Sequence, residues 1–296
     1  MKEKKYTFEF HPTGKILEGK KANYNYAYGF AYDKLIYKGK TKYQKIELYE
    51  TPWLGKLLKL DGYFQTSEKD EFFYHEAMTQ PALFSHPNPK KVLIIGGGDC
   101  GILKQVLSHG SVEKVIMVEI DQEVIDFSKK YLKFIHKNSF KNSKAEIIVG
   151  DGKKFVEETK EKFDLIISDL TDPIGPSKAL YTRSFYQKIS SKLEKNGIFM
   201  THLDLATTRP ELSKWIYKNL KSVFKFSSVF VSYIPLYGSL MAFSINSNYI
   251  DATKIKNEII QKRLKERKVK NLKWYCPKIH QALFSLPVYL KKLFKI

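Results

Sequence analysis

The chain has 296 residues, of which 43% are hydrophobic, and it carries a formal net charge of +20 at pH 7. Its mean hydropathy of −0.36 is typical of a globular protein, and no stretch approaches the ~18 continuous apolar residues of a membrane-spanning helix. Two cysteines, Cys100 and Cys276, exclude a disulfide framework and a zinc knuckle. The charged first residues lack a following apolar segment, which argues against a signal peptide, so we expect a reducing cytoplasm.

The first part of the chain has the pattern of a small β domain. Residues 43–49 and 56–60 alternate polar and apolar side chains around a turn, which predicts an antiparallel hairpin with one face in water. The aromatic-rich residues 24–37 are expected to be extended as well. We therefore expect two domains, an N-terminal β-strand domain over 1–70 and a larger domain over 71–296.

From residue 91 onward, apolar runs alternate with amphipathic segments, as in a parallel sheet with helices on both faces. The runs predict strands at 91–95, 115–118, 145–149, 163–168 and 198–202. The amphipathic segments predict helices at 70–80, 102–109, 122–134, 182–193 and 210–223. Two final runs, 229–234 and 241–245, are joined by a short link, which indicates an antiparallel edge on a mostly parallel sheet.

The most informative segment is 91–101, in which an apolar run leads directly into a glycine cluster that contains a carboxylate. Gly96 and Gly98 lack a Cβ, so the backbone here can approach a ligand closely. Asp99 argues against a phosphate ligand, because a carboxylate would repel the anion that such loops often bind at a helix N-terminus. The segment therefore predicts a nucleoside-bearing ligand with a cationic group near Asp99.

Four of the apolar runs each end near a carboxylate, namely Asp99, Glu119, Asp151 and Asp169. Because ligands of open α/β sheets bind at the carboxyl ends of the strands, we expect these acids along one edge of the sheet. Glu119 follows the glycines by about 20 residues, where an acid accepts hydrogen bonds from ribose hydroxyls, and Asp151 is placed to accept from an adenine amino group. Acids at strand ends also cap helices, and for each acid taken singly this reading stays open.

The basic net charge leaves two readings open. The lysines are scattered, and the densest stretch is 254–273 together with Lys291 and Lys292. The sequence has no zinc-finger spacing, no aromatic RNA-recognition signature and no convincing helix-turn-helix, so a solvated lysine-rich surface is favoured over nucleic-acid binding. Acidic residues gathered in one predicted cleft instead favour a small polycationic substrate.

Several segments give the chain a more specific resemblance. They are 43–46, 60–62, 70–76, 86–99, 118–121, 150–152, 169–176, and 234–235 with Tyr237. In this order and spacing they resemble the polyamine aminopropyltransferases, the spermidine synthase family, over most of residues 40–290. The resemblance implies a small N-terminal β domain joined to a Rossmann-like domain of the class I methyltransferase fold, with a seven-stranded sheet. It also implies transfer of a 3-aminopropyl group from decarboxylated S-adenosylmethionine to a polyamine, with release of 5′-methylthioadenosine.

The matching motif positions carry the family's site residues onto this sequence. The nucleoside donor would be held by Gln44, Gly96, Gly98, Asp99, Glu119, Asp151 and Gly152. The acceptor amine would be surrounded by Gln65, Tyr74, Asp99, Asp169, Asp172 and Tyr237. Asp169 would be the catalytic base, and residues 169–176 would form a gate over the bound ligands. The donor is a co-substrate, no cofactor or metal is expected, and the family's members are often homodimers or homotetramers.

Three residues depart from the commonest family pattern. Cys100 replaces a glycine of the loop, Leu170 replaces a serine of the gate, and His202 stands where relatives often have glutamine or an acid. The gate and the residues that follow it are similar to the thermospermine synthase branch. Putrescine giving spermidine is the family's commonest reaction. Spermidine giving thermospermine or spermine stays open, as do agmatine and cadaverine as acceptors.

The side chains suit this chemistry. A primary amine is mostly protonated at neutral pH, so the site has to bind an ammonium and then remove a proton, which Asp169 can do. The sulfonium donor is already activated, and displacement depends on the in-line placement of nitrogen, carbon and sulfur. Asp99 would attract the ammonium of the decarboxylated donor and repel the carboxylate of ordinary S-adenosylmethionine.

Two other functions stay open on the sequence alone. An S-adenosylmethionine-dependent amine N-methyltransferase would use the same fold, and a basic nucleic-acid-binding protein would use it without catalysis. His75 and His86 are expected to be structural, since no second cluster of metal ligands accompanies them. Cys100 is expected to fill space in the loop, with a thiol pKa raised by Asp99. Neither nucleic acid nor a membrane is expected as a partner.

Overall fold

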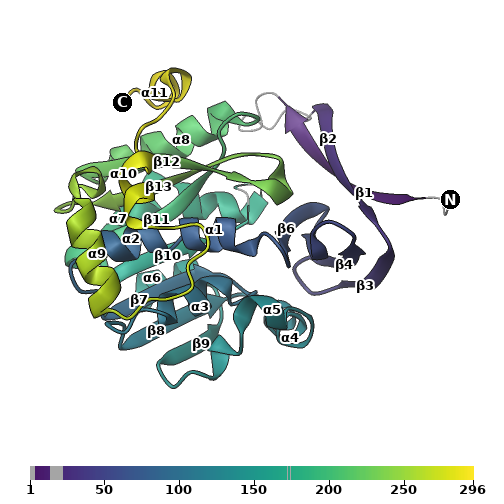
Figure 1. Ribbon diagram of the computed structural model, residues 1–296, viewed down its shortest axis with the longest axis horizontal. Helices are drawn as coiled ribbons and strands as arrows, with labels where there is room; N and C mark the ends of the chain where they lie inside the picture. Colours follow the sequence, from purple (N-terminus) through teal and green to yellow (C-terminus); the bar gives the residue numbers. More distant parts are fainter. Residues whose placement is uncertain (1–3, 14–22, 172, 174) are drawn as a thin grey trace.

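A computed structural model describes residues 4–13, 23–171, 173 and 175–296. Its strands form three sheets, of two, four and seven strands, and helices surround the largest of them (Figure 1). The two small sheets come from the N-terminal strands and stand to one side of the seven-stranded sheet. Within the described residues, no helix is long and apolar enough to cross a membrane.

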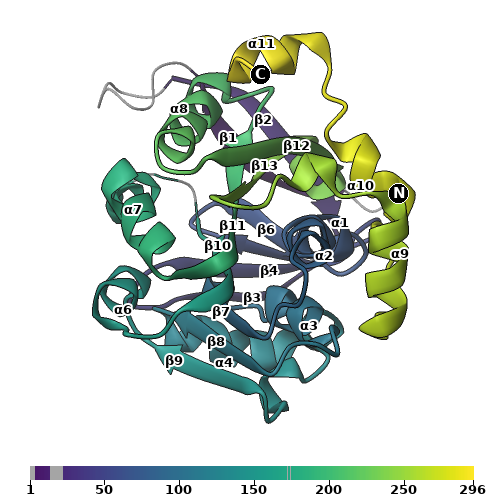
Figure 2. The ribbon, with the colours of Figure 1, turned by 90° about the vertical axis from the view of Figure 1, so that its left-hand side faces the viewer.

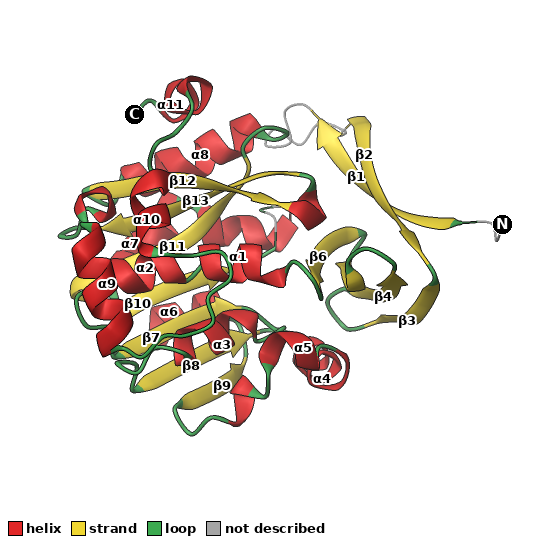
Figure 3. Cartoon of the chain, in the orientation of Figure 1, coloured by secondary structure: helices red, strands yellow, loops and turns green. Residues whose placement is uncertain are grey.

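The described N-terminal part consists of strands (Figure 3). These are β1 (Lys5–Thr13), β2 (Asn23–Tyr32), β3 (Lys34–Lys40), β4 (Lys45–Thr51), β5 (Gly55–Leu60) and β6 (Tyr63–Ser67). β1 and β2 form an antiparallel ribbon, and β3 to β6 form an antiparallel meander in which each strand pairs with the next. The expected hairpin is β4–β5, and the aromatic-rich stretch divides between β2 and β3.

The expectation that one face of this hairpin lies in water is wrong. Leu57 of β5 packs into the main core, whereas Leu58, on the opposite face, packs against Val124 and Phe127 of helix α4 (Gln122–Tyr131). An alternating pattern does not reveal that a helix from elsewhere in the chain covers the second face. The division into domains at residue 70 stays a prediction, because the core cluster that contains Leu57 continues into the large sheet.

The seven-stranded sheet confirms the expected fold class. In spatial order its strands are β12 (Phe226–Ile234), β13 (Ser239–Ser247), β11 (Leu193–Leu205), β10 (Phe163–Asp169), β7 (Lys91–Gly96), β8 (Lys114–Glu119) and β9 (Ala145–Val149). The strands from β11 to β9 run parallel, and β13 pairs antiparallel with both β11 and β12. The antiparallel edge was expected, but not the insertion of the last strand between β11 and β12.

Helices cover both faces of this sheet (Figure 2). One face carries α1 (Glu71–Ala77), α2 (Gln80–Ser85) and α3 (Gly101–Leu107), and the other carries α6 (Gly152–Glu158), α7 (Arg183–Ser191) and α8 (Pro210–Lys221). Alternate residues of β7 divide between the two layers: Val92 and Ile94 belong to the first core cluster, Leu93 and Ile95 to the second. Both faces of β7 are therefore buried, which explains its continuous apolar run.

The helices agree with the expected positions except for two breaks. The helix expected at 70–80 is divided into α1 and α2, and the one expected at 122–134 is divided at Leu132 into α4 and α5 (Lys133–His136). The C-terminal residues form α9 (Asn257–Glu266), α10 (Pro277–Leu283) and α11 (Val288–Phe294).

Buried charges tie the C-terminal segment to α1 and α2. The Glu76 carboxylate accepts hydrogen bonds from the backbone N–H groups of Lys273, Trp274 and Tyr275 at 2.8, 2.9 and 2.8 Å. The Arg267 guanidinium donates to three backbone carbonyl oxygens in and just after α2, at 2.6 to 2.8 Å. Part of the basic stretch at 254–273 therefore has a structural role rather than a binding one.

Candidate active site

The four carboxylates that follow the strands lie along one edge of the sheet. β10, β7, β8 and β9 are parallel neighbours, and their register places Asp169 beside Gly96 and Glu119 beside Val149. Asp99 and Asp151 follow β7 and β9 in the loops at the same edge. The rule that parallel strands bring their carboxyl ends together thus places these acids as expected.

The glycine loop packs closely against its protein neighbours. Gly96 and Gly97 have φ angles of +84° and +78°, a region that favours glycine. A Cβ on Gly96 would lie 2.0 Å from the carbonyl oxygen of Asp169, and one on Gly98 would lie 3.2 Å from Oε2 of Glu119. The missing side chains therefore let the loop pack against β10 and Glu119, a role beyond the close ligand approach that the sequence indicated.

Two of the four acids also serve the starts of helices, as the capping alternative allowed. Asp151 is the N-cap of α6 and accepts from two backbone N–H groups of its first turn, at 2.7 and 3.3 Å. Oδ1 of Asp99 accepts from the N–H of Gly101 at 2.8 Å, where α3 begins. Beside Asp151, a Cβ on Gly152 would lie 2.4 Å from Cγ2 of Ile95, so the helix start packs tightly on β7.

Glu119 ends β8 with only 9% of its surface exposed. Burial raises the pKa of its carboxyl to about 7, and the nearby acids Asp121 and Asp169 add to this effect. Hydrogen bonds from the backbone N–H groups of Ile120 and Asp121 oppose the rise, the latter reaching Oε1 at 3.0 Å. The carboxyl can therefore change its protonation state near neutral pH. A bound ligand that interacts better with one of the two states would make that state predominate.

The loop before β4 brings the N-terminal sheet to the same edge. Nε2 of Gln44 donates to Oδ2 of Asp121 at 3.1 Å, and the Thr41 hydroxyl donates to the same oxygen at 2.6 Å. Asp121 is also the N-cap of α4. Gln44 therefore lies close to the end of β8. The sequence did not indicate this bond, since Gln44 and Asp121 are far apart in the chain.

Asp169 is the centre of a second group at this edge. Its Oδ1 accepts from the Tyr74 hydroxyl at 2.6 Å. Burial and then the Asp99 carboxylate raise the pKa of Asp169, against the Tyr74 hydroxyl and two nearby histidines. The ring of Tyr237 lies edge-on to that of Tyr74 with centroids 6.1 Å apart, and its hydroxyl donates to the backbone oxygen of Gln65 at 2.9 Å. Pairwise contacts thus connect four of the six expected acceptor residues, namely Asp169, Tyr74, Tyr237 and Gln65, and Asp99 is close enough to raise the pKa of Asp169.

His202, which is 2% exposed, forms a hydrogen bond with the backbone that follows β10. Its Nε2 lies 2.8 Å from the carbonyl oxygen of Leu170 and 3.1 Å from the Tyr181 hydroxyl. That hydroxyl also donates to the carbonyl oxygen of Thr171 at 3.1 Å. Two of the residues that depart from the commonest family pattern, Leu170 and His202, are therefore in contact. Asp172, an expected acceptor residue, lies outside the described residues.

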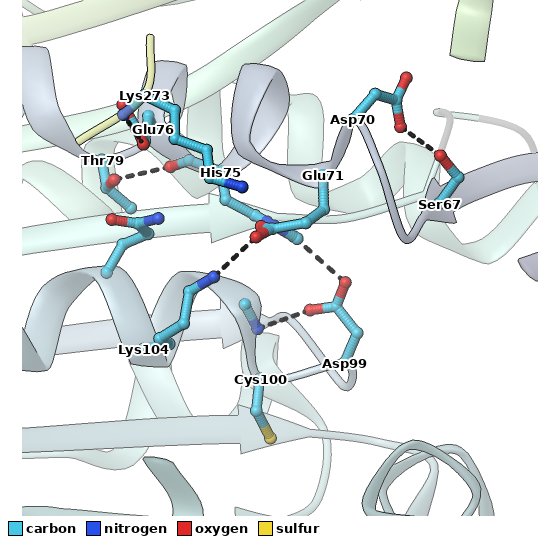
Figure 4. A network of polar contacts seen from close by, with 12 residues as sticks. Ser67, Asp70, Glu71, His75, Glu76, Thr79, Asp99, Cys100, Lys104 and Lys273 are labelled. Atoms are coloured by element: carbon cyan, nitrogen blue, oxygen red, sulfur yellow. Dashed lines mark hydrogen bonds and ion pairs between the residues drawn. The ribbon is translucent and has the colours of Figure 1, made fainter. Parts of the chain in front are cut away.

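His75, for which the sequence indicated a structural role, contacts one of the predicted site residues. Its Nε2 is 3.1 Å from Oδ2 of Asp99, and its Nδ1 is 2.6 Å from Oε2 of Glu71 (Figure 4). The sequence contained a signal for the contact between Glu71 and His75, because residues four apart on one short helix lie on the same face. Tyr74 lies on the same helix. What the sequence lacked was the position of that helix over the glycine loop.

His86 and Cys100 have the properties expected of them. His86 accepts from the backbone N–H of Asn88 at 3.2 Å, and burial lowers its pKa to about 4. Burial, and then Asp99, raise the pKa of the Cys100 thiol to about 12, so the expected rise is confirmed with burial as its main cause. Across the described ranges, no group of three or more histidines, cysteines and acids is arranged to hold a metal ion.

Comparisons with known proteins match both the N-terminal sheets and the large α/β part. Residues 71–257 match a family model described as the spermine/spermidine synthase domain, and residues 20–68 match one described as the spermidine synthase tetramerisation domain. The polyamine aminopropyltransferase of Caldicellulosiruptor saccharolyticus is 42% identical over 261 residues, which are 88% of this chain and 91% of that protein. The polyamine aminopropyltransferase of Sulfurisphaera tokodaii is 41% identical over 268 residues, or 90% and 89% of the two chains.

Solved structures agree with these matches. A spermidine synthase crystallised in complex with the transition state analogue AdoDATO superposes with a TM-score of 0.89 at 36% identity, covering 98% of this chain and 95% of that one. The spermidine synthase from Thermotoga maritima gives a TM-score of 0.88 at 35% identity, with coverage of 98% and 94%.

Proposed function

This chain belongs to the spermine/spermidine synthase family and is a polyamine aminopropyltransferase, and we propose that it converts putrescine to spermidine. The 3-aminopropyl group would come from decarboxylated S-adenosylmethionine, the family's co-substrate, leaving 5′-methylthioadenosine. The observation that carries the proposal is the position of Asp169, bonded to Tyr74, at the same sheet edge as Asp99 and Glu119. Negative groups there suit a sulfonium donor beside a protonated amine.

We assign the donor to the part of the edge between β9 and β7. Glu119 would accept from the ribose hydroxyls, as an acid at this strand end does in dinucleotide-binding folds, and Asp151 would accept from the adenine amino group. Gly152 directly follows Asp151, and Gln44 is bonded to Asp121, whose backbone N–H donates to Glu119. Gly96 and Gly98 would form the floor under the sulfonium. Asp99 would face the ammonium that remains after decarboxylation.

We assign the acceptor amine to Asp169 and the residues around it. The carboxylate would first hold the ammonium and then accept one proton from it, and its raised pKa favours that acceptance. The nitrogen lone pair attacks the carbon attached to sulfur, a C–N bond forms, and the C–S bond breaks with its electron pair kept by sulfur. The Tyr74 hydroxyl holds the carboxylate oriented through its 2.6 Å hydrogen bond, and Tyr237 and Gln65 line the acceptor's path.

The affinity for 5′-methylthioadenosine is expected to weaken as the pH falls below 7. A ribose hydroxyl donates to an ionised carboxylate, so protonation of Glu119 removes the acceptor, and affinity should drop by up to about tenfold per pH unit. Calorimetric titration between pH 5.5 and 8 measures this. The Glu119→Gln variant should bind weakly with a flat pH profile. A wild-type profile as flat as that of the variant would contradict the assignment.

The proposed acceptor is tested by a panel of putrescine, cadaverine, agmatine and spermidine with the decarboxylated donor. Products are separated by chromatography, and their molecular masses are measured by mass spectrometry. We expect putrescine to give the highest kcat/KM, with a 3-aminopropyl gain in the product. A methyl gain from S-adenosylmethionine would instead indicate an N-methyltransferase, and inactivity of all four amines in folded protein would refute the proposal.

A longer acceptor is the second candidate, favoured by the gate. Leu170 resembles the thermospermine synthase branch at this position, and its backbone oxygen is fastened by His202. Spermidine giving thermospermine or spermine is therefore the outcome to look for if putrescine reacts poorly in the same panel.

We further propose a homotetramer assembled through the N-terminal sheets, in keeping with the tetramerisation domain matched by residues 20–68. The adjoining strand β1 carries three aromatic side chains, Tyr6, Phe8 and Phe10, that are 45 to 56% exposed in the single chain. Contiguous exposed aromatic groups are typical of contact surfaces between proteins. A reducing cytoplasm is the proposed compartment, which suits two unpaired cysteines.

A further inference from the structure

We propose that Glu71 is a positioning residue of this site: it holds the His75 imidazole so that Nε2 donates to Asp99, which fixes the Asp99 carboxylate toward the donor's ammonium group. The inference rests on the donor assignment made above. It concerns a residue that would touch neither substrate.

A continuous chain of contacts supports this role (Figure 4). Lys104 Nζ on α3 lies 2.8 Å from Oε1 of Glu71, and the other oxygen of Glu71 lies 2.6 Å from Nδ1 of His75. On the far side of the ring, Nε2 lies 3.1 Å from Oδ2 of Asp99. Since Oδ1 of Asp99 accepts from the Gly101 N–H at 2.8 Å, both oxygens of this carboxylate have a fixed partner. Asp99 therefore has little freedom to rotate.

The imidazole ring has no room to turn away from this arrangement. An added Cβ on Gly101 would lie 2.3 to 2.7 Å from three atoms of the His75 ring, so the ring rests directly on the backbone where α3 begins. The side chain of His75 is 3% exposed and that of Glu71 is 10% exposed. A glycine at this position is what lets the ring fit between α1 and the loop that carries Asp99.

The charges of Lys104, Glu71, His75 and Asp99 suit this row of contacts. Burial disfavours the imidazolium, but the Asp99 and Glu71 carboxylates outweigh it and raise the pKa of His75 to about 10. Burial likewise raises the pKa of Glu71, and His75 and Lys104 overcome this and lower it to about 2. Both nitrogens of the imidazolium can therefore donate throughout the neutral range.

Other ionisable groups near His75 include Asp70 at the N-cap of α1, Asp169 on β10, and the Cys100 thiol beside Asp99. Burial raises the pKa of Asp70, and His75 partly offsets that rise. Of the two carboxylates that His75 contacts, only Glu71 lies outside the proposed ligand site. Glu71 is therefore the group whose removal would release His75 while leaving every proposed ligand contact intact.

The first test compares two ligands that differ by the aminopropyl group. Affinities for the decarboxylated donor and for 5′-methylthioadenosine are measured by calorimetry without any amine, in wild type, Glu71→Gln and Glu258→Gln. Glu258 is the matched control, since both glutamates lie in the first turn of a helix, Glu258 in α9 and Glu71 in α1. Unlike Glu71, Glu258 is exposed.

We expect Glu71→Gln to weaken binding of the donor at least ~10-fold and that of 5′-methylthioadenosine by less than ~3-fold, because only the donor carries the ammonium. Glu258→Gln should match the wild type. Unchanged donor affinity, or an equal loss for both ligands, would overturn the proposal. Gly101→Ala, which displaces the ring and keeps every charge, should likewise weaken the donor selectively, and undiminished donor binding there would also count against it.

The second test needs no ligand, so it separates this proposal from the proposed function. His75 is protonated when folded up to about pH 10 and is neutral when unfolded above about pH 6.5, so unfolding between these values releases a proton. The unfolding constant of the wild type should therefore rise with pH by up to about tenfold more per unit than that of Glu71→Gln between pH 7.5 and 9.5. Equal pH slopes of the unfolding constant in the two proteins would show that Glu71 does not raise the pKa of His75. If the wild type bound neither nucleoside, the donor assignment would fail instead.

Discussion

Replacing Asp169 by asparagine is expected to lower kcat by about 10²- to 10⁴-fold, the usual contribution of a positioned general base. The amide cannot accept the proton that the acceptor ammonium must lose. The nucleoside contacts of Glu119 and Asp151 would remain, so the affinity for 5′-methylthioadenosine should change by less than about threefold. The measurement is steady-state kinetics with the decarboxylated donor, combined with calorimetry of the nucleoside product.

Loss of folding would not account for this result. The pKa of Asp169 is raised in the folded chain, so its ionised form opposes folding as the pH rises, and the asparagine variant should be no less stable than the wild type at pH 8. Asp126→Asn, at an exposed acid on α4, is the control and should retain full activity. Turnover by Asp169→Asn within a few-fold of the wild type would show that another group takes the proton.

Replacing Gly96 by alanine is expected to destabilise the protein by roughly 2–5 kcal/mol and to abolish most activity. The left-handed backbone costs about 1–2 kcal/mol for a residue with a Cβ, and overpacking adds about 1–3 kcal/mol. Here the φ angle is +84°, and the new Cβ would meet the Asp169 carbonyl oxygen at 2.0 Å. Relief of this clash has to move either the glycine loop or the backbone that carries the catalytic base. Denaturant unfolding and kcat/KM together measure the effect.

Gly150 provides the matched control for that substitution. It lies at the same edge of the sheet, but a Cβ there would meet nothing within 4 Å. Gly150→Ala should therefore alter the free energy of unfolding by less than about 0.5 kcal/mol. Equal stabilities for Gly96→Ala and Gly150→Ala would mean that the close packing of the loop on β10 is not required.

The positions of the four edge acids could be predicted because they follow from local patterns and one rule of topology. Each buried parallel strand is a short apolar run, and parallel neighbours must end at the same edge. The shared position of these acids could therefore be predicted without knowing which strand pairs with which. They are Asp99, Glu119, Asp151 and Asp169. The same patterns did not show that β13 lies between β11 and β12, since a short antiparallel link allows either order at the edge.

Contacts between segments far apart in the chain could not be predicted. The bond from Gln44 to Asp121 depends on how the N-terminal sheet docks, and the bond from His75 to Asp99 depends on where α1 crosses the glycine loop. Likewise, the structural role of Arg267 requires carbonyl oxygens exposed at the end of α2, which composition does not reveal. Composition therefore did not show that Arg267, within the basic stretch at 254–273, is bound inside the fold.

The central claim is that acids at one edge of the sheet seat a sulfonium donor beside a protonated amine held at Asp169. A crystal structure with 5′-methylthioadenosine and putrescine bound tests it most directly. We expect the adenine against Asp151, the ribose hydroxyls on Glu119, and the methylthio group facing an amine nitrogen within hydrogen-bonding distance of Asp169. A nucleoside bound elsewhere on the molecule, or an amine held away from Asp169, would contradict the account.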